Sequence, residues 1–314
     1  MNIPALDLDA VAAACARAGL RVERDAPSAA FTTYRCGGPL AVLVRVGAVD
    51  DVRTLASTVD VQAVPVLVMG RGSNLLVADA GFRGIAVVLD GAFEGLELDR
   101  ATGEVVAGSA VPLPVLARRS AAAGIGGLEF YVGIPGSVGG AVRMNAGGHG
   151  RDTAEVLISV RGVDLGSGTV EERTAADLEL GYRHSNLSGT TVVLDARLAG
   201  RPDDPELCNA RIAQIVQWRR EHQPGGQNAG SVFTNPVGDA AGRLIEASGA
   251  KGARIGGAVV SEKHANFFVA DDTATATDVY RLVRDVQRRV ADATGVVLVP
   301  ELQLIGFDDE AGDA

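Results

Sequence analysis

Residues 133–150 read Gly-Ile-Pro-Gly-Ser-Val-Gly-Gly-Ala-Val-Arg-Met-Asn-Ala-Gly-Gly-His-Gly and could bind phosphate through the backbone. Glycine lacks a Cβ and readily adopts positive φ, so its main-chain N–H groups can approach phosphate oxygens closely. Pro135 stiffens the start of this run, and Asn145 adds a polar side chain. So much glycine argues against a packed strand or an uninterrupted helix. The run predicts a phosphate cradle, with a glycine-rich surface turn as the alternative.

A second glycine loop, Gly70-Arg-Gly-Ser-Asn74, lies between apolar stretches at 64–69 and 75–77. This order predicts a strand, a ligand-binding loop and another strand. The chain has no Gly-Lys-Ser/Thr of the Walker type, and neither loop has the spacing of a Rossmann fingerprint. Two such loops favour a long ligand with a central pyrophosphate, and a dinucleotide is the natural candidate.

Secondary-structure elements must position these two loops. Up to residue 200 the sequence predicts mostly short strands, and after residue 200 it predicts more helices. Gly-Arg-Pro-Asp-Asp-Pro at 200–205 indicates a boundary and a helix start. The expected helices are 9–19, 50–58, a helix opened by Pro112 and Pro114 and closed by Gly124, 206–220, 240–248 and 278–293. The expected strands are 40–46, 64–69, 75–77, 85–89, 96–98, 105–107, 156–163 paired with 169–172, 190–198, 258–260, 267–269 and 296–305, with a disordered acidic tail at 308–314.

Composition narrows the function classes. The net charge of −10 argues against a dedicated binder of nucleic acid or of anionic membranes, because such proteins concentrate positive charge. Three dispersed cysteines, Cys15, Cys36 and Cys208, favour a reducing cytoplasm over a disulfide framework. The four histidines, including His149, show no metal-ligand spacing, so no metal is expected. No apolar run reaches the ~18 residues typical of a membrane span.

Several blocks, in order, resemble the UDP-N-acetylenolpyruvoylglucosamine reductase family. The resemblance runs from about residue 31 to 306, and its blocks occupy 70–77, 81–84, 127–130, 133–150, 182–185, 229–236 and 300–301. It implies an α+β fold, with an FAD-binding domain of the vanillyl-alcohol-oxidase (PCMH) type in two subdomains and a smaller α+β substrate-binding domain. The implied boundaries are 1–205 (about 1–90 and 91–205), 206–297, and a returning strand with tail at 298–314.

The same resemblance implies non-covalent FAD, NADPH as the hydride source and UDP-N-acetylglucosamine enolpyruvate as substrate, reduced to the peptidoglycan precursor UDP-N-acetylmuramate. We therefore expect a cytoplasmic enzyme with a role in cell-wall biogenesis, cell shape and cell division. A monomer is slightly favoured over an oligomer. The residues expected to bind FAD are Gly70, Arg71, Gly72, Ser73, Asn74, Leu75, Gly133, Ile134, Pro135, Gly136, Ser137, Gly139, Gly140, Ala141, Asn145, Ala146 and Gly147.

Three residues match the catalytic positions of that family. Hydride addition to an enol ether conjugated to a carboxylate builds negative charge, which needs cations, hydrogen bonds and a proton. Arg183 would hold the carboxylate, Ser231 would donate the proton, and Glu301 would hydrogen-bond the intermediate. Tyr182, Asn235, His264 and Asn266 are the expected substrate contacts.

Two positions depart from the family pattern, and two other functions compete with the reductase. The family often has a lysine where this chain has Thr234, and often another lysine near the position of His222. Arginines such as Arg219, Arg243 or Arg254 would then have to bind the phosphate groups. The spacing between Arg183 and Ser231 resembles the shorter, second subtype. An oxidase of the same flavin fold, anchored covalently through His149, is the main alternative, and a catalytically silent flavin or sugar-nucleotide sensor is the other.

Overall fold

A computed structural model describes residues 7–307 and has an α+β fold. These residues form two compact units, each assembled from separated segments. The first unit comprises the described residues through Asp25, Ala41–Arg71 and Arg83–Arg219, and the second comprises Ala26–Leu40, Gly72–Phe82 and the described residues from Arg220. The loop 70–74 therefore crosses from one unit to the other after Arg71.

The first unit contains a four-stranded sheet in the order β1-β2-β5-β3, which runs from Arg21–Pro27 through Pro39–Val46 and Phe82–Leu89 to Val66–Met69. Helices α1 (Leu8–Arg17) and α2 (Val49–Thr58) share its apolar core. Strand β1 was not predicted, because only Ala26 in it is fully buried and its sequence shows no apolar alternation.

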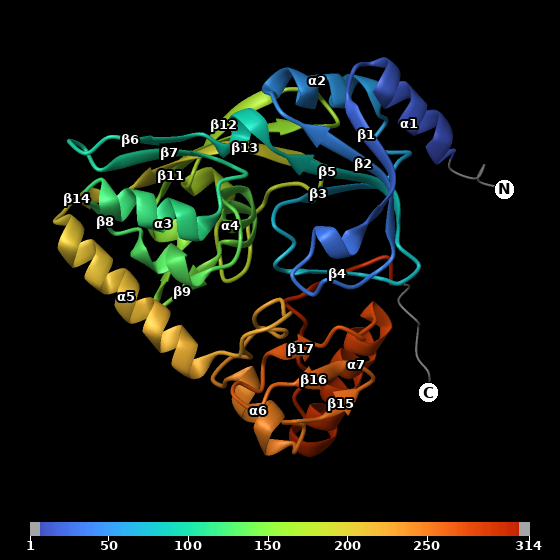
Figure 1. Ribbon diagram of the computed structural model, residues 1–314, viewed down its shortest axis with the longest axis vertical. Helices are drawn as coiled ribbons and strands as arrows, with labels where there is room; N and C mark the ends of the chain where they lie inside the picture. Colours follow the sequence, from blue (N-terminus) through green and yellow to red (C-terminus); the bar gives the residue numbers. More distant parts are fainter. Residues whose placement is uncertain (1–6, 308–314) are drawn as a thin grey trace. The chain divides into compact units, whose positions relative to one another are not determined.

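The second sheet of this unit is antiparallel, with the strand order β12-β11-β13-β7-β6. Its strands are Val170–Thr174, Leu157–Asp164, Thr191–Ala199, Glu104–Gly108 and Leu96–Leu98. Central strand β13 supplies Val192 and Leu194 to the core that it shares with α1 and α2. It supplies Val193 to the core that it shares with α3 (Leu113–Ala122) and α4 (Val138–Met144). Figure 1 shows these two helices next to the sheet. Strand β13 is thus buried on both faces.

A β-bulge in β13 connects this sheet to the glycine-rich run. The register between β11 and β13 shifts between Arg161 and Gly162, opposite Leu194. The Leu194 carbonyl accepts a hydrogen bond of 2.9 Å from Ser109 N, and Ser109 O accepts one of 2.9 Å from Gly139 N. The bulge therefore fixes where the glycine-rich run begins its helix.

Helix α5 (Pro205–His222) follows the short pairs β8–β14 (Ile125–Gly126 with Arg201–Pro202) and β9–β10 (Gly147–Gly148 with Arg151–Asp152). It starts at the predicted Pro-Asp boundary, and Cys208 and Ile212 are its buried residues. The 3-10 helices are η1 (Ser28–Ala30), η2 (Gly91–Glu94), η3 (Glu129–Gly133), η4 (Thr153–Glu155) and η5 (Ala176–Leu178).

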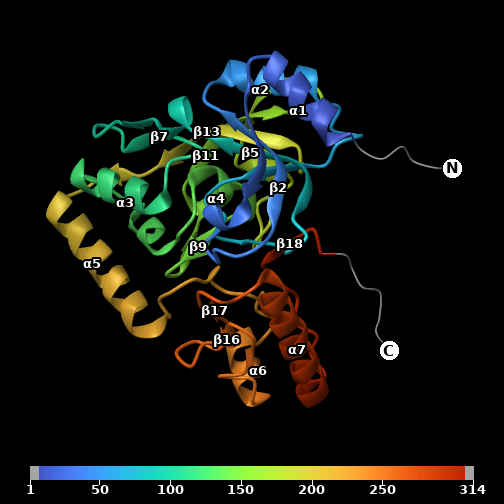
Figure 2. The same cartoon turned by 45° about the vertical axis from the view of Figure 1, so that its right-hand side comes forward.

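The second unit has a three-stranded antiparallel sheet of β15 (Arg254–Ile255), β16 (Ala258–Val260) and β17 (Phe268–Ala270). Helix α7 (Ala276–Thr294) packs on β15 and β16, and α6 (Ala241–Ala247) packs on α7 (Figure 2). Helix α7 begins with a capping box at Thr275 and Asp278 and ends at Gly295, whose φ is +75°. Its apolar residues recur at helical spacing and form its buried face, and the predicted helix 278–293 is confirmed.

The predicted strand 296–305 was wrong over most of its length. Only β18 (Gln303–Ile305) forms a ladder, running parallel to β4 (Leu75–Val77). Residues before it make isolated contacts, including a bridge between Pro300 and Phe233. Proline has no N–H to continue a ladder, so Glu301 lies just before the strand instead of inside it.

No helix among residues 7–307 is both long enough and apolar enough to cross a membrane. The predicted acidic tail at 308–314 lies outside the described residues.

Candidate active site

The glycine-rich run contains a helix at its centre. Val138–Met144 forms α4, with Val138, Ala141 and Val142 buried in the core. The prediction that the run is neither a packed strand nor one uninterrupted helix is confirmed, because a short helix with one buried apolar face is flanked by glycine-rich backbone. The amides of Val138 and Gly139 donate to Val111 O and Ser109 O. These two N–H groups are thus used by the protein itself.

Close approach between the two glycine loops occurs at Gly70 and Ser137 in the first unit. A Cβ placed on Gly70 would lie 2.5 Å from Ser137 Oγ, so a larger residue would displace this serine. The hydroxyls of Ser137 and Ser109 are buried and have no hydrogen-bond partner among residues 7–307. Buried hydroxyls of this kind usually have a partner, which a bound ligand with acceptor oxygens would provide.

A matching arrangement surrounds Gly72 in the second unit. Gly72 has φ +58°, and a Cβ on it would lie 2.0 Å from Phe31 O. The hydroxyls of Thr32 and Thr33 nearby are buried and have no hydrogen-bond partner within residues 7–307. Glycines that exclude side chains, beside unsatisfied hydroxyls, fit a cofactor rich in phosphate and hydroxyl oxygens.

Sequence reasoning did not select Ser109, Thr32 or Thr33. Thr32 and Thr33 lie in the loop between η1 and β2, and Ser109 follows the last residue of β7. No spacing marks these residues, because segments distant in the sequence bring them to the glycines.

Tyr182 and Arg183 form the tip of a tight turn in the first unit. Gly181 and His184 exchange two main-chain hydrogen bonds of 3.1 Å, which leaves the two residues between them at the tip. Arg183 has φ +56°, a left-handed conformation that is uncommon for a non-glycine residue. Its guanidinium carbon lies 5.2 Å from the centre of the Tyr182 ring, and the Tyr182 side chain is exposed.

The buried side chain of Asn145 holds this turn. Its Nδ2 donates to Gly181 O at 2.9 Å and to Asp152 Oδ2 at 3.1 Å, and its Oδ1 accepts from Ala154 N at 2.8 Å. Asn145 also ends α4 with φ +40°. Both of its amide hydrogens and its carbonyl oxygen are thus engaged within the protein.

Ser231 and Glu301 lie on neighbouring segments of the second unit. Ser231 bridges Phe267, and the next residue, Val232, accepts a 2.8 Å hydrogen bond from Glu301 N. Both side chains are partly buried. Asn74, expected in the cofactor loop, donates from Nδ2 to Glu301 O at 3.0 Å. Three predicted site residues thus converge within one unit.

Asn266 supports the segment that carries Ser231. Its side chain is buried and pairs with the main chain of Phe233, accepting from Phe233 N at 3.0 Å and donating to Phe233 O at 2.8 Å. Its own N–H donates to His264 Nδ1 at 3.2 Å. Burial, with a contribution from Lys251, lowers the pKa of His264, although its own backbone contact opposes this. An uncharged His264 is consistent with its role as acceptor.

Asn235 and Thr234 also bond to the main chain. Asn235 Oδ1 accepts from Ala241 N at 3.0 Å, at the start of α6. Thr234 N and its hydroxyl both donate to Val299 O, at 2.9 and 3.2 Å. At the position where a lysine was expected, this threonine therefore joins two segments.

Among the arginines considered as phosphate partners, Arg219 lies beside the glycine run. A Cβ on Gly133 would lie 3.3 Å from Arg219 Cδ and 3.2 Å from the His149 ring. Arg243 and Arg254 pair with Asp239 and Asp271. Burial first, and then Arg219, lowers the pKa of His149, whose ring packs edge-on against Trp218 at 5.0 Å.

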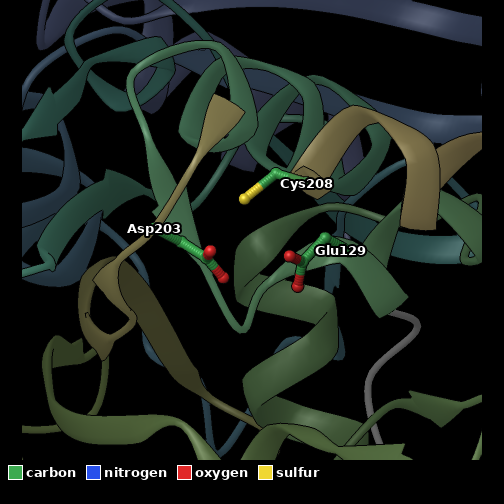
Figure 3. Close-up of side chains that lie close together, drawn as sticks. All are labelled: Glu129, Asp203 and Cys208. Carbon is green, nitrogen blue, oxygen red and sulfur yellow. The ribbon is translucent and has the colours of Figure 1, made fainter. Parts of the chain in front are cut away.

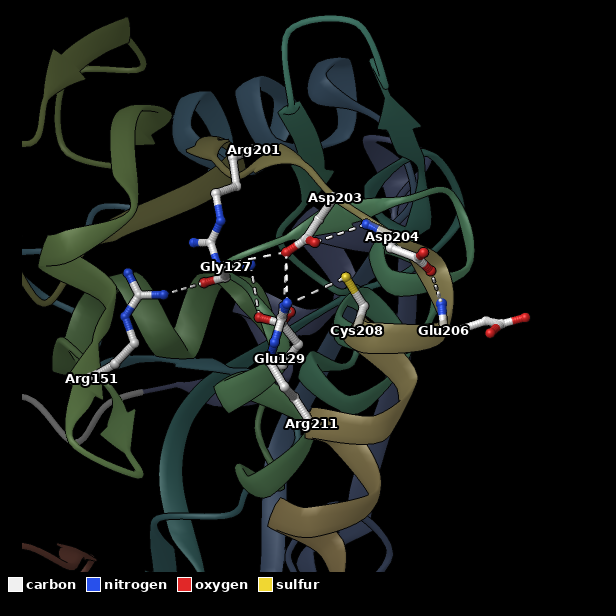
Figure 4. Close-up of polar contacts among 9 residues, drawn as sticks. All are labelled: Gly127, Glu129, Arg151, Arg201, Asp203, Asp204, Glu206, Cys208 and Arg211. Atoms are coloured by element: carbon white, nitrogen blue, oxygen red, sulfur yellow. Dashed lines mark hydrogen bonds and ion pairs between the residues drawn. The ribbon is translucent and has the colours of Figure 1, made fainter.

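A separate polar cluster joins α5 to the first unit. Glu129, Asp203 and Cys208 point toward one another (Figure 3). Arg211 pairs with both carboxylates, reaching Asp203 Oδ2 at 2.8 Å (Figure 4). Burial raises the pKa of Glu129, but hydrogen bonds, including those from Arg211 and Gly127 N, outweigh it and lower that pKa overall. The guanidinium thus supplies the positive charge that this cluster needs.

Comparison with known proteins assigns both parts of the chain. Residues 39–173 match the family described as "FAD binding domain", and residues 221–305 match "UDP-N-acetylenolpyruvoylglucosamine reductase, C-terminal domain". The UDP-N-acetylenolpyruvoylglucosamine reductase of Methylorubrum extorquens (strain PA1) is 41% identical over 304 residues, covering 96% of this chain and 97% of the relative. That of Caulobacter vibrioides is 42% identical over 287 residues, covering 90% and 94%.

A solved structure gives the same result for the fold. The crystal structure of UDP-N-acetylenolpyruvylglucosamine reductase (MurB) from Thermus caldophilus matches with a TM-score of 0.79 and 35% identity, covering 91% of this chain and 99% of that one. The expected α+β fold with an FAD-binding domain is confirmed. The chain belongs to the UDP-N-acetylenolpyruvoylglucosamine reductase family.

Proposed function

We propose that this protein reduces UDP-N-acetylglucosamine enolpyruvate to UDP-N-acetylmuramate with NADPH and non-covalently bound FAD, a step of peptidoglycan precursor synthesis. Family membership and the FAD-binding match over 39–173 support the reaction and the cofactor. The observation that carries the proposal is the Glu301 N–H bond to Val232 O, which places Glu301 beside the segment of Ser231.

The cofactor would be held by the two glycine loops. Gly70, Gly72 and the buried Ser137 hydroxyl support this assignment, and we add Ser109, Thr32 and Thr33 to the residues expected from the sequence. Asn145, expected to bind FAD, is left out of this assignment, because its side-chain amide and carbonyl are already engaged within the protein. When bound, FAD supplies hydride transfer from NADPH to the enol methylene carbon of the substrate.

Three side chains would meet the charge and the proton that this reduction requires. Arg183 binds the carboxylate and balances the negative charge that develops on it. Ser231 donates its hydroxyl proton to the carbon that bears the carboxylate, because this carbon becomes strongly basic. Glu301 hydrogen-bonds the substrate as its charge changes.

Tyr182, Asn235, His264 and Asn266 would complete the substrate site. Tyr182 has an exposed ring next to Arg183 and can contact substrate directly. The hydrogen bonds of Asn266 and His264 support an indirect contribution, in which they fix the main chain around Ser231. Asn235 does the same at the start of α6.

The setting that we propose is the cytoplasm, as a monomer with neither a nucleic-acid nor a membrane partner, and with a role in cell shape and division. The net charge of −10 supports the absence of a polyanionic partner.

Anaerobic single-turnover measurements test the reaction. NADPH should bleach the flavin absorbance, and the enolpyruvyl sugar nucleotide should restore it. A protein that binds no flavin, or whose reduced flavin is not reoxidised by this substrate, would refute the proposal. Acid precipitation is the control for the oxidase alternative. We expect the flavin in the supernatant, whereas a yellow pellet would favour a covalent link such as one through His149.

A further inference from the structure

The turn that carries Tyr182 and Arg183 is attached to the C-terminal end of α4 by side chains as well as by its own backbone. Ser185 Oγ donates to Arg143 O at 2.7 Å. Arg143 Nη1 donates to Leu187 O at 3.2 Å and to Ser188 O at 2.6 Å. Asn145 Nδ2 donates to Gly181 O at 2.9 Å, on the other side of the turn. The last turn of α4 therefore grips both flanks of the segment.

Asn145 is the member of this set that bonds directly to Gly181, one of the two residues that close the turn. It is 2% exposed, and its amide has one possible orientation, because Oδ1 must face Ala154 N while Nδ2 faces two acceptors. Asp152 Oδ2 accepts one of those hydrogens at 3.1 Å and so directs the other at Gly181 O. The contact is directional and built from buried groups.

The conformation of Arg183 explains why such a support is needed. Its φ of +56° is unfavourable for a residue with a side chain and persists only where the surroundings fix it. Within the turn, Gly181 and His184 are joined by two hydrogen bonds of 3.1 Å. Asn145 secures the Gly181 end of this pair to α4.

We infer that Asn145 is a positioning residue for the reaction, which acts through Arg183 by fixing the Gly181–His184 turn against α4. The inference rests on the proposed role of Arg183 in binding the substrate carboxylate. Asn145 itself touches neither the reacting atoms nor the carboxylate; its contribution is the placement of the guanidinium.

Asn145→Asp tests this inference with little change in size. The carboxylate still accepts from Ala154 N, but it places an acceptor against Gly181 O and against the Asp152 carboxylate. We expect kcat/KM for the enolpyruvyl substrate to fall about tenfold to a hundredfold, the scale of a misplaced catalytic group. Flavin content and the rate of flavin reduction by NADPH should stay at wild-type values, because substrate is absent from that step.

Asn186→Asp is the matched control. Asn186 lies in the same segment and donates to Asp177 O at 2.9 Å, away from the Gly181 contact. This variant should keep wild-type kcat/KM. An equal loss in both variants would overturn the inference, as would wild-type kcat/KM in Asn145→Asp or a loss of flavin from it.

A double-mutant cycle separates a role through Arg183 from a general one. If Asn145 acts by placing Arg183, Asn145→Asp should cause little further loss in an Arg183→Ala background. Full additivity of the two losses would overturn the inference. If Asn145→Asp does not fold, the same cycle with Ser185→Ala, which removes the bond to Arg143 O, should show the same non-additivity. Failure of the proposed function is distinct, since wild type itself would then not reoxidise its flavin with this substrate.

Discussion

The side-chain amide of Asn74 donates a 3.0 Å hydrogen bond to the main-chain carbonyl of Glu301, a residue 227 positions later in the chain. Asn74 O in turn accepts from Gln303 N at 3.0 Å, where β4 and β18 begin to pair. A residue expected in the cofactor loop thus fixes the backbone of an expected catalytic residue.

Replacing Asn74 with alanine should therefore affect both stability and the substrate step. Loss of one partly buried hydrogen bond predicts a decrease of about 1 kcal/mol in the free energy of unfolding, measured by urea denaturation. Flavin reoxidation by substrate should slow as well, because Glu301 is less firmly held. Gln303→Ala is the control, since its Nε2 reaches the same carbonyl only at 3.4 Å. Equal effects of the two variants would argue against this role of Asn74.

Removing the Ser231 hydroxyl should separate the two half-reactions. In Ser231→Ala we expect NADPH to reduce the flavin normally while product formation falls by about 10²- to 10⁴-fold, the usual contribution of a general acid. Stopped-flow absorbance and product analysis measure the two steps. Ser231→Cys, which retains a transferable proton, should recover part of the activity, and Ser248→Ala in the same unit should behave as wild type. Full turnover by Ser231→Ala would exclude it as the proton donor.

Truncating Arg211 to alanine should destabilise the first unit. Glu129 and Asp203 would lose their shared cation, and removing one partner of a buried ion pair costs about 3–5 kcal/mol. We expect about 2–3 kcal/mol, because the Arg211 side chain is 35% exposed and partly screened by solvent. Arg211→Ala combined with Glu129→Gln should recover part of this loss in urea denaturation. No loss in the single variant would show that the cluster contributes little.

The pH dependence of stability follows from the lowered pKa of Glu129. In the folded state this carboxyl holds its proton less tightly than in the unfolded state. Its contribution to the free energy of unfolding is therefore fully present above its ordinary pKa of 4.5. The contribution is lost as the pH falls below that value, through the folded-state pKa. Urea denaturation between neutral pH and pH 3 should show a smaller decline for Glu129→Gln than for wild type. Parallel declines would contradict this assignment.

The sequence by itself determined the family, the fold class and most elements. Helix α7 has an apolar stripe between its N-cap Thr275 and its C-cap Gly295, so the apolar periodicity and the capping residues predict the same helix. The glycines at 70 and 72 were likewise readable as points of close approach, because only a residue without Cβ fits against Ser137 and Phe31. Such signals are local, so they can be recognised in the sequence without knowledge of the fold.

Tertiary structure alone decided what the polar side chains do. Asn145 and Asn266 satisfy main-chain groups 36 and 33 positions away in the sequence, and Thr234 joins its segment to Val299. The fold also brings Thr32, Thr33 and Ser109 to the glycine loops, where their hydroxyls are buried. It places Glu301 outside the last strand, which has only three residues and begins after Pro300. A hydrogen bond depends on partners that only the folded chain brings within about 3 Å. Spacing in the sequence carries no record of those partners.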